Sequence, residues 1–153
     1  MSRRCWLFKS EPDCYSFDDL VRDGVSPWEG VRNYTSRNHM SSMKLGDLGF
    51  FYHSSCEVPG IAGTCEVVRE AYADGTQFDV KSEYFDPKAT PENPRWFMVD
   101  LKPIAKFKKY VPLAQLREAA GLEEMIVAKR GNRLSITPVT EAEWEIVLAL
   151  GAK

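Results

Sequence analysis

The sequence has no apolar run long enough to cross a membrane. A transmembrane helix needs about 20 consecutive apolar residues, and charged or polar residues interrupt every apolar run of this 153-residue chain well before that length. The basic N-terminus also leads into a strand pattern rather than into the apolar segment of a signal peptide. We therefore expect a soluble protein that is not exported and that has no membrane partner.

Paired cysteines are missing as well. The four cysteines, at positions 5, 14, 56 and 65, include no C-x-x-C pair, so neither a zinc knuckle nor a dense disulfide framework is indicated. Reduced thiols are typical of the cytoplasm. We expect a cytoplasmic protein, nucleoid-associated if bacterial and nuclear if eukaryotic, with no metal and no cofactor.

Histidine is scarce, which limits acid–base chemistry. Only His39 and His53 are present, and His53, three residues before Cys56, has no evident third residue to orient it. A non-catalytic protein is therefore expected. The alternative is a small nucleic-acid-processing enzyme that uses His53 with Glu11 or Glu57.

An excess of positive charge is absent too. Twenty basic residues oppose 22 acidic ones and give a net charge of −2, which argues against nonspecific coating of nucleic acid. However, three windows without acids, 31–45, 101–117 and 125–140, hold eleven of the basic residues. They form either one basic face around a pocket or three separate solvated patches.

The patterns that are present predict strands in the middle of the chain and helices near its ends. Arg4 to Lys9 is a strand pattern with Trp6 and Phe8 on one face, and Trp96 to Ile104 is typical of a central strand covered on both sides. Helix starts are predicted where a capping residue precedes an apolar stripe, at Ser16 with Asp19 and at Thr140 with Glu143. Residues 81–95, with three prolines, form a loop. No βα alternation or repeat is found, so we expect one α+β domain over residues 1–153 with a curved or closed sheet.

The segment from Trp28 to Asn38 combines an aromatic ring, two arginines and two asparagines. Such side chains suit a flat polar ring, because arginine and asparagine hydrogen-bond along its edge and tryptophan stacks on its face. A nucleobase is the obvious ligand. The alternative is a helix from Tyr34 to about Met43, capped by Asn33, with a solvated polar face.

Five ordered motifs over nearly the whole chain resemble the EVE-domain family of the PUA-like superfamily, which also includes the YTH readers of methylated adenine. The motifs are Trp6 to Pro12, Trp28 to Tyr34 with Arg37 and Asn38, Phe50 to Ser54, Pro59 to Gly63, and Arg133 to Ile136 with Pro138. The resemblance implies a PUA-like curved sheet or β-barrel flanked by short helices. One departure is Thr35-Ser36, where the family pattern has Gln-Ala, so hydrogen bonding from Thr35 can shift ligand preference.

The resemblance also implies a modified-base reader that binds nucleic acid as a monomer. Modified cytosine in DNA, such as 5-methyl- or 5-hydroxymethylcytosine, is the first expectation, and modified RNA is the alternative; an adaptor that binds proteins through the 81–95 loop is a third. The expected base pocket, with Trp28 as a stacking wall, comprises Lys9, Ser10, Trp28, Asn33, Tyr34, Asn38, His53, Tyr84, Phe85 and Ser135. The expected phosphate contacts are Arg32, Arg37 and Arg133.

Overall fold

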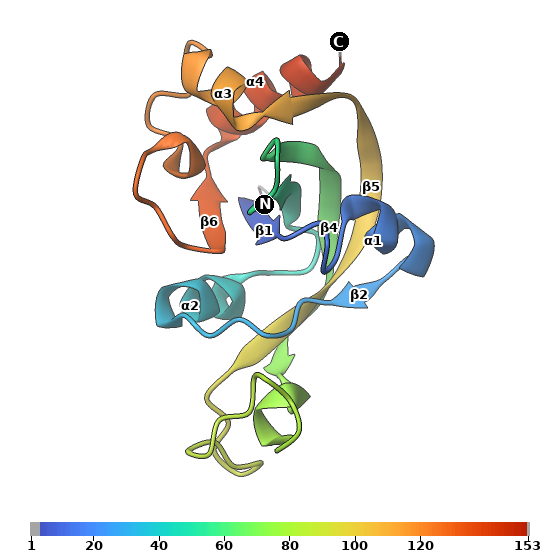
Figure 1. Ribbon diagram of the computed structural model, residues 1–153, viewed down its shortest axis with the longest axis vertical. Coiled ribbons are helices and arrows are strands. Elements are labelled where there is room, and N and C mark those ends of the chain that lie inside the picture. Colours follow the sequence, from blue (N-terminus) through green and yellow to red (C-terminus); the bar gives the residue numbers. More distant parts are fainter. Residues whose placement is uncertain (1–3, 153) are drawn as a thin grey trace.

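The protein folds around one curved, mixed β-sheet (Figure 1). The computed structural model describes residues 4–152, and within them six strands lie in the order β2-β5-β4-β3-β1-β6, with four α-helices around the sheet. The strands are β1 (Cys5–Ser10), β2 (Ser26–Pro27), β3 (Leu48–His53), β4 (Gly60–Ala73), β5 (Phe97–Pro112) and β6 (Ile136–Val139). The helices are α1 (Phe17–Asp23), α2 (Tyr34–Ser42), α3 (Leu113–Glu118) and α4 (Glu141–Ala152), with short 3₁₀ turns at Gly75–Phe78 and Ile126–Ala128. The α+β prediction is confirmed.

One pair of neighbouring strands, β1 and β3, is parallel, and the other strand pairs are antiparallel. Cys5 lies opposite Leu48 and Ser10 opposite His53, so both strands end at the same edge of the sheet. Parallel neighbours require a long crossover connection. Residues 11–47 provide it and contain α1, β2 and α2.

Each face of the sheet carries its own apolar core. Side chains of a strand alternate between faces, and accordingly Trp6 and Phe8 pack in one buried cluster while Leu7 packs in the other. In β3, Phe51 joins the first cluster and Phe50 the second. The predicted alternation in β1 is confirmed, and the two cores fix the register of the central strands.

The predicted helix starts are confirmed by their hydrogen bonds. Ser16 and Asp19 form a reciprocal capping box at α1, and Thr140 and Glu143 do the same before α4, at 3.0 and 3.1 Å. Asn33 caps α2 by accepting a 3.0 Å hydrogen bond from the Ser36 amide. Local side-chain chemistry therefore sets where these helices begin.

The prediction for Trp96 to Ile104 is only partly right. The strand begins at Phe97 and continues to Pro112, and Ile104 is 50% exposed rather than covered. β2 pairs only with Leu101 and Asp100, so the rest of β5 is an open edge of the sheet. Lysines on such an edge discourage pairing with another chain, and β5 carries four.

The segment from Asp74 to Trp96, which joins β4 to β5, is held at its base by Gln77. The Gln77 side chain is fully buried, and its Nε2 donates to the carbonyls of Asp74 (2.7 Å) and Trp96 (2.8 Å). Its Oε1 accepts from the amides of Arg95 and Trp96. Although this loop lacks a regular helix or strand over 81–95, its two ends are therefore fixed side by side.

None of the helices within residues 4–152 is both long and apolar enough to cross a bilayer. The predicted domain boundary at 1–153 includes residues 1–3 and 153, which lie outside the described part of the chain. That boundary stays a prediction.

Candidate functional site

A cavity of about 790 Å³ opens where β1 and β3 end. Lys9 and Ser10, the last residues of β1, line one side, together with Ser54, which follows β3 and donates its amide to the Ser10 carbonyl at 2.9 Å. The crossover segment from Ser26 to Arg32 lines another side. Seven of the predicted site residues lie here: Lys9, Ser10, Trp28, Arg32, Tyr84, Arg133 and Ser135.

Trp28 lies between this cavity and the core. Its indole is 8% exposed and packs edge to face against Phe8 (5.5 Å, 70°) and Phe51 (5.4 Å, 86°). The Trp28 amide donates to the Val99 carbonyl at 2.7 Å, which fixes the backbone to β5. Trp28 is thus both a core residue and part of the cavity lining, rather than only one of the two.

Tyr84 reaches the cavity from the β4–β5 loop and packs on Gly30. A Cβ atom at Gly30 would lie 2.7 Å from the Tyr84 ring, and Gly30 has a φ of +82°. Only glycine accepts both that φ and that close approach without strain. The Tyr84 ring therefore packs directly against the backbone of Gly30 in the crossover segment.

Arg32 fastens the same loop and has no free donor. Its five N–H groups donate to the Tyr84 carbonyl (2.7 and 3.1 Å), the Val31 carbonyl, Asp74 Oδ2 (3.3 Å) and Thr76 Oγ1 (2.9 Å). We predicted a phosphate contact for Arg32, but such a contact would require breaking one of these bonds. The structure gives Arg32 a positioning task, which is to hold Tyr84 against the cavity.

Asp74 is the buried partner of Arg32. Its side chain has no exposed surface and accepts from the Gly30 amide (2.8 Å), the Thr76 amide (2.9 Å) and the Thr76 hydroxyl as well. Burial raises the pKa of Asp74, but these hydrogen bonds and that from Arg32 outweigh it and hold the pKa below its ordinary value. Asp74 is therefore ionised at neutral pH.

Lys9 is a half-buried cation with no anion beside it. Within residues 4–152 its ammonium has no carboxylate or hydrogen-bond acceptor in range, and the nearest marked contact is the Tyr52 ring at 6.0 Å. Burial lowers the pKa of Lys9 from its ordinary value. An acceptor brought by a ligand would relieve this desolvation cost.

The remaining predicted residues lie outside the cavity lining. Asn33 is occupied with capping α2, Asn38 Oδ1 accepts from the Arg37 guanidinium, and Tyr34 stacks on Trp96 with ring centroids 4.8 Å apart. Phe85 is exposed. Arg37 contacts the Arg95 carbonyl at 3.0 Å, beside the Tyr34 ring.

His53 also lies outside the cavity lining, and its imidazole is already engaged. Its Nε2 accepts a 3.1 Å hydrogen bond from the Phe17 amide at the start of α1. Burial, helped by Lys106 and opposed by Asp18, lowers the pKa of His53. A neutral imidazole whose Nε2 is used as an acceptor cannot take a proton there, so the structure gives no support to the enzyme alternative at this residue.

Several cavity residues were not predicted, among them Glu29, Ser54 and Ser55, and Glu11 was predicted only as part of the enzyme alternative. Position is the signal that the sequence holds for Glu11 and Ser54, because each directly follows the end of a strand. Thr35, at the departure from the family pattern, is exposed and does not line the cavity. Its neighbour Ser36 is buried and accepts from the Ile136 amide at 3.3 Å, tying α2 to β6.

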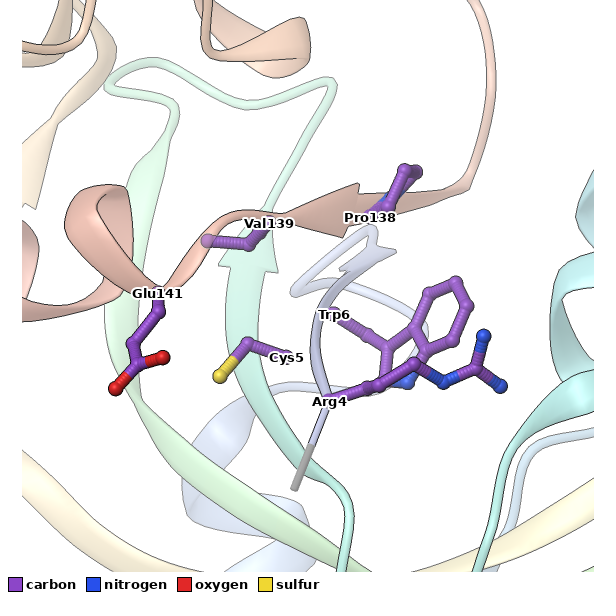
Figure 2. Close-up of a pocket in the computed structure, with 6 residues that line it drawn as sticks. All are labelled: Arg4, Cys5, Trp6, Pro138, Val139 and Glu141. Atoms are coloured by element: carbon purple, nitrogen blue, oxygen red, sulfur yellow. The ribbon is translucent and has the colours of Figure 1, made fainter. Parts of the chain in front are cut away.

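A second, smaller cavity of about 210 Å³ lies at the other end of β1 (Figure 2). In Figure 2, Arg4 and Trp6 lie on one side of the strand and Cys5 and Glu141 on the other. The Trp6 Nε1 is used by Asp47 at 3.1 Å, and burial and Glu141 raise the pKa of Cys5 to about 11, so this thiol stays protonated. In residues 4–152, no group of three or more metal-binding side chains occurs in this cavity or elsewhere.

Comparison with known proteins assigns the family. The EVE domain model matches residues 4–150. Human thymocyte nuclear protein 1 is 41% identical over 97% of this chain and 74% of its own length. A hypothetical protein from Leishmania major is 45% identical with a TM-score of 0.93, covering 98% of this chain and 95% of that one. The structure of human THYN1 protein in complex with 5-methylcytosine containing DNA is 41% identical, with a TM-score of 0.91 and 98% of both chains covered.

Both the sequence model and these structural matches extend over essentially the whole described chain, including all the strands and helices around the larger cavity. The chain belongs to the EVE-domain family.

Proposed function

We propose that this protein is a non-catalytic nucleic-acid-binding module that accepts one modified base in the cavity lined by Trp28 and Tyr84. The observation that carries the proposal is the unpaired, half-buried Lys9 ammonium in a cavity that is also lined by three aromatic residues, Tyr15, Trp28 and Tyr84. A base could satisfy both features. Its carbonyl oxygens can accept from the Lys9 ammonium, and its faces can stack on the aromatic rings. The Ser135 hydroxyl lies in the same lining, and the Ser10 hydroxyl, which donates to the Tyr15 carbonyl at 2.5 Å, can accept from a donor on the base edge. Arg133 lines the cavity and is exposed, which supports its predicted role as a phosphate contact.

The comparisons support DNA with a modified cytosine as the first ligand to test. A relative that is 41% identical was crystallised with DNA containing 5-methylcytosine. Modified RNA is the second candidate. With a net charge of −2, phosphate attraction is limited, so the cavity has to supply the selective part of the affinity.

The first test is a titration with matched oligonucleotides that differ only in one base. We expect tighter binding to the strand with modified cytosine, by roughly tenfold, because one methyl group in a shaped pocket contributes about 1–3 kcal/mol. Affinities should be measured at two salt concentrations, and a shallow slope is expected from few phosphate contacts. Equal affinities for all modified and unmodified strands, DNA and RNA, would contradict the proposal.

The substitution Lys9→Met should weaken ligand binding without lowering the stability of the protein. Because the folded-state pKa of Lys9 is lowered, its charge disfavours the folded state at neutral pH, and this cost disappears as pH rises through the unfolded pKa. The variant should therefore melt at the wild-type temperature or above it, while losing a charge-assisted hydrogen bond of about 1.5–3 kcal/mol to the ligand, which is tenfold to a hundredfold in affinity. Thermal unfolding and titration at pH 7 measure both.

Lys44→Met is the matched control, because Lys44 is exposed and lies outside the cavity lining. It should change affinity only slightly. Wild-type affinity should also fall as pH is raised from 7 towards 10, more than that of Lys9→Met. A Lys9→Met protein that binds the modified strand like wild type would remove Lys9 from the site.

A further inference from the structure

A cluster of aromatic and arginine side chains lies beside the larger cavity, where α2 meets the end of the β4–β5 loop. We call it the Tyr34 patch; it consists of Tyr34, Arg37, Arg95 and Trp96. Tyr34 stacks on Trp96 at 4.8 Å with an interplanar angle of 25°. The guanidinium carbons of Arg37 and Arg95 lie 4.6 and 5.9 Å from the Tyr34 ring centroid. Two cations thus surround one aromatic pair.

The patch adjoins the cavity through a single side chain, Arg32. The Arg32 guanidinium carbon lies 5.3 Å from the Trp96 ring, which belongs to the patch, and 5.4 Å from the Tyr84 ring, which lines the cavity. Because Arg32 is fixed by all five of its donors, the distance between patch and cavity is fixed too. A strand whose base entered the cavity would have its neighbouring nucleotides within reach of the patch.

The patch is open and keeps positive charge. Tyr34 is 46% exposed. Arg37 donates only to neutral oxygens, those of the Arg95 carbonyl and the Asn38 amide, and among residues 4–152 it has no carboxylate within 4.0 Å. Arg95 has a single distant one, Asp86 at 3.9 Å.

A contact that only fastened α2 to the loop would be expected to bury the tyrosine and to pair both arginines with carboxylates. Here Arg95 does pair with Asp86 and also donates to the Tyr34 hydroxyl, but Tyr34 stays 46% exposed and, among residues 4–152, Arg37 has no carboxylate partner. An exposed aromatic ring next to an uncompensated arginine is instead a component that holds single strands, because bases stack on the ring and phosphates pair with the guanidinium group.

We propose that the Tyr34 patch holds the strand next to the base that the cavity accepts, with the Tyr34 ring stacking on a neighbouring base and Arg37 and Arg95 contacting its phosphate. This proposal rests on the function proposed above. The patch recognises no particular base, so it raises affinity for modified and unmodified strands alike.

The test compares ligands of two lengths. The probes are 5-methyl-2′-deoxycytidine 5′-monophosphate, which can fill only the cavity, and a single-stranded 9-mer with 5-methylcytosine at its centre, which can reach both sites; an unmodified 9-mer serves as reference. Tyr34→Ala should bind the 9-mer about tenfold or more weakly than wild type. Arg37→Gln should reduce the slope of log affinity against log salt by about one phosphate contact. Neither should change affinity for the mononucleotide.

Two controls keep the result interpretable. Arg117→Gln removes the same charge from α3, which lies at the opposite end of the molecule from the β4–β5 loop in Figure 1, and should leave the salt slope unchanged. Tyr34→Phe keeps the ring and removes only the hydroxyl, which accepts a hydrogen bond from Arg95. It should keep the affinity, so a loss in Tyr34→Ala alone assigns the effect to the ring rather than to that hydrogen bond.

The two proposals fail in different ways. If Tyr34→Ala and Arg37→Gln bind the 9-mer with the affinity and the salt slope of wild type, the proposal for the Tyr34 patch is wrong, whether or not the protein prefers the modified base. A wild-type protein that binds both 9-mers equally overturns the modified-base proposal and therefore this one as well, since no accepted base would then anchor the strand.

Discussion

Replacing Arg32 with alanine is expected to lower the free energy of unfolding by about 3–5 kcal/mol, because it leaves the Asp74 carboxylate buried without its cation. The Tyr84 carbonyl loses two hydrogen bonds at the same time. For a domain of this size, the loss corresponds to a decrease of the melting temperature of roughly 6–20 °C. Thermal and denaturant unfolding at pH 7 measure it.

The matched control is Arg22→Ala, which breaks an ion pair of similar length on the surface. Arg22 pairs with Asp19 at 2.9 Å, but its side chain is 67% exposed, and solvent-exposed pairs of this kind contribute little to stability. The pH dependence is a second check. Because the folded-state pKa of Asp74 is lowered, its stabilisation is full above the unfolded value of about 3.9 and is lost as pH falls through the folded value. If Arg32→Ala hardly changes the free energy of unfolding, the β4–β5 loop is not held in place through Asp74.

Trp28→Ala is the second large effect, and it should damage both stability and binding. Removal of a packed tryptophan costs about 3–5 kcal/mol, and the contacts with Phe8 and Phe51 place Trp28 in that class. If its ring also stacks on the ligand, affinity for the modified strand should fall about tenfold or more. Both quantities should be measured on one preparation, with binding assayed below the lowered melting temperature.

Trp144→Ala separates the two effects. Trp144 is as buried as Trp28, stacks on Phe50 at 4.0 Å, and belongs to the core on the other face of the sheet. The Trp144→Ala variant should have a melting temperature as low as that of Trp28→Ala. Its folded fraction should bind the modified strand with wild-type affinity. If Trp28→Ala behaves in the same way, Trp28 is a core residue only, and Tyr15 and Tyr84 are the aromatic residues left to contact a base in the cavity.

The local parts of the fold could be predicted from the sequence because their causes lie within a few residues. Ser16 with Asp19 and Thr140 with Glu143 act across three positions, and the opposite faces of Trp6 and Leu7 follow from adjacent positions in one strand. The parallel pairing of β1 with β3 has no such local signal. It was not predicted; the resemblance implied only a PUA-like curved sheet or β-barrel.

The candidate site could also be predicted in part. Lys9, Ser10, Trp28, Tyr84 and Ser135 were predicted by chemistry and resemblance, and they do line one cavity. Side-chain type does not reveal whether a polar group is already occupied. The carboxylate that engages Arg32 is Asp74, 42 positions away, and the ring that stacks on Tyr34 is that of Trp96, so neither task could be seen in the segment from Trp28 to Asn38.

The parallel pairing of β1 with β3 also bears on how the molecule folds. The cavity combines the ends of these strands with the crossover between them and a residue of the β4–β5 loop, so its walls meet only after segments far apart in the sequence have come together. Contacts between distant residues slow folding, since chain entropy is lost before they form. We expect the hairpin of β4 and β5, which pairs through most of its length, to form early and the cavity to form last. A fragment released by translation before residue 135 would then be compact in part and still unable to bind.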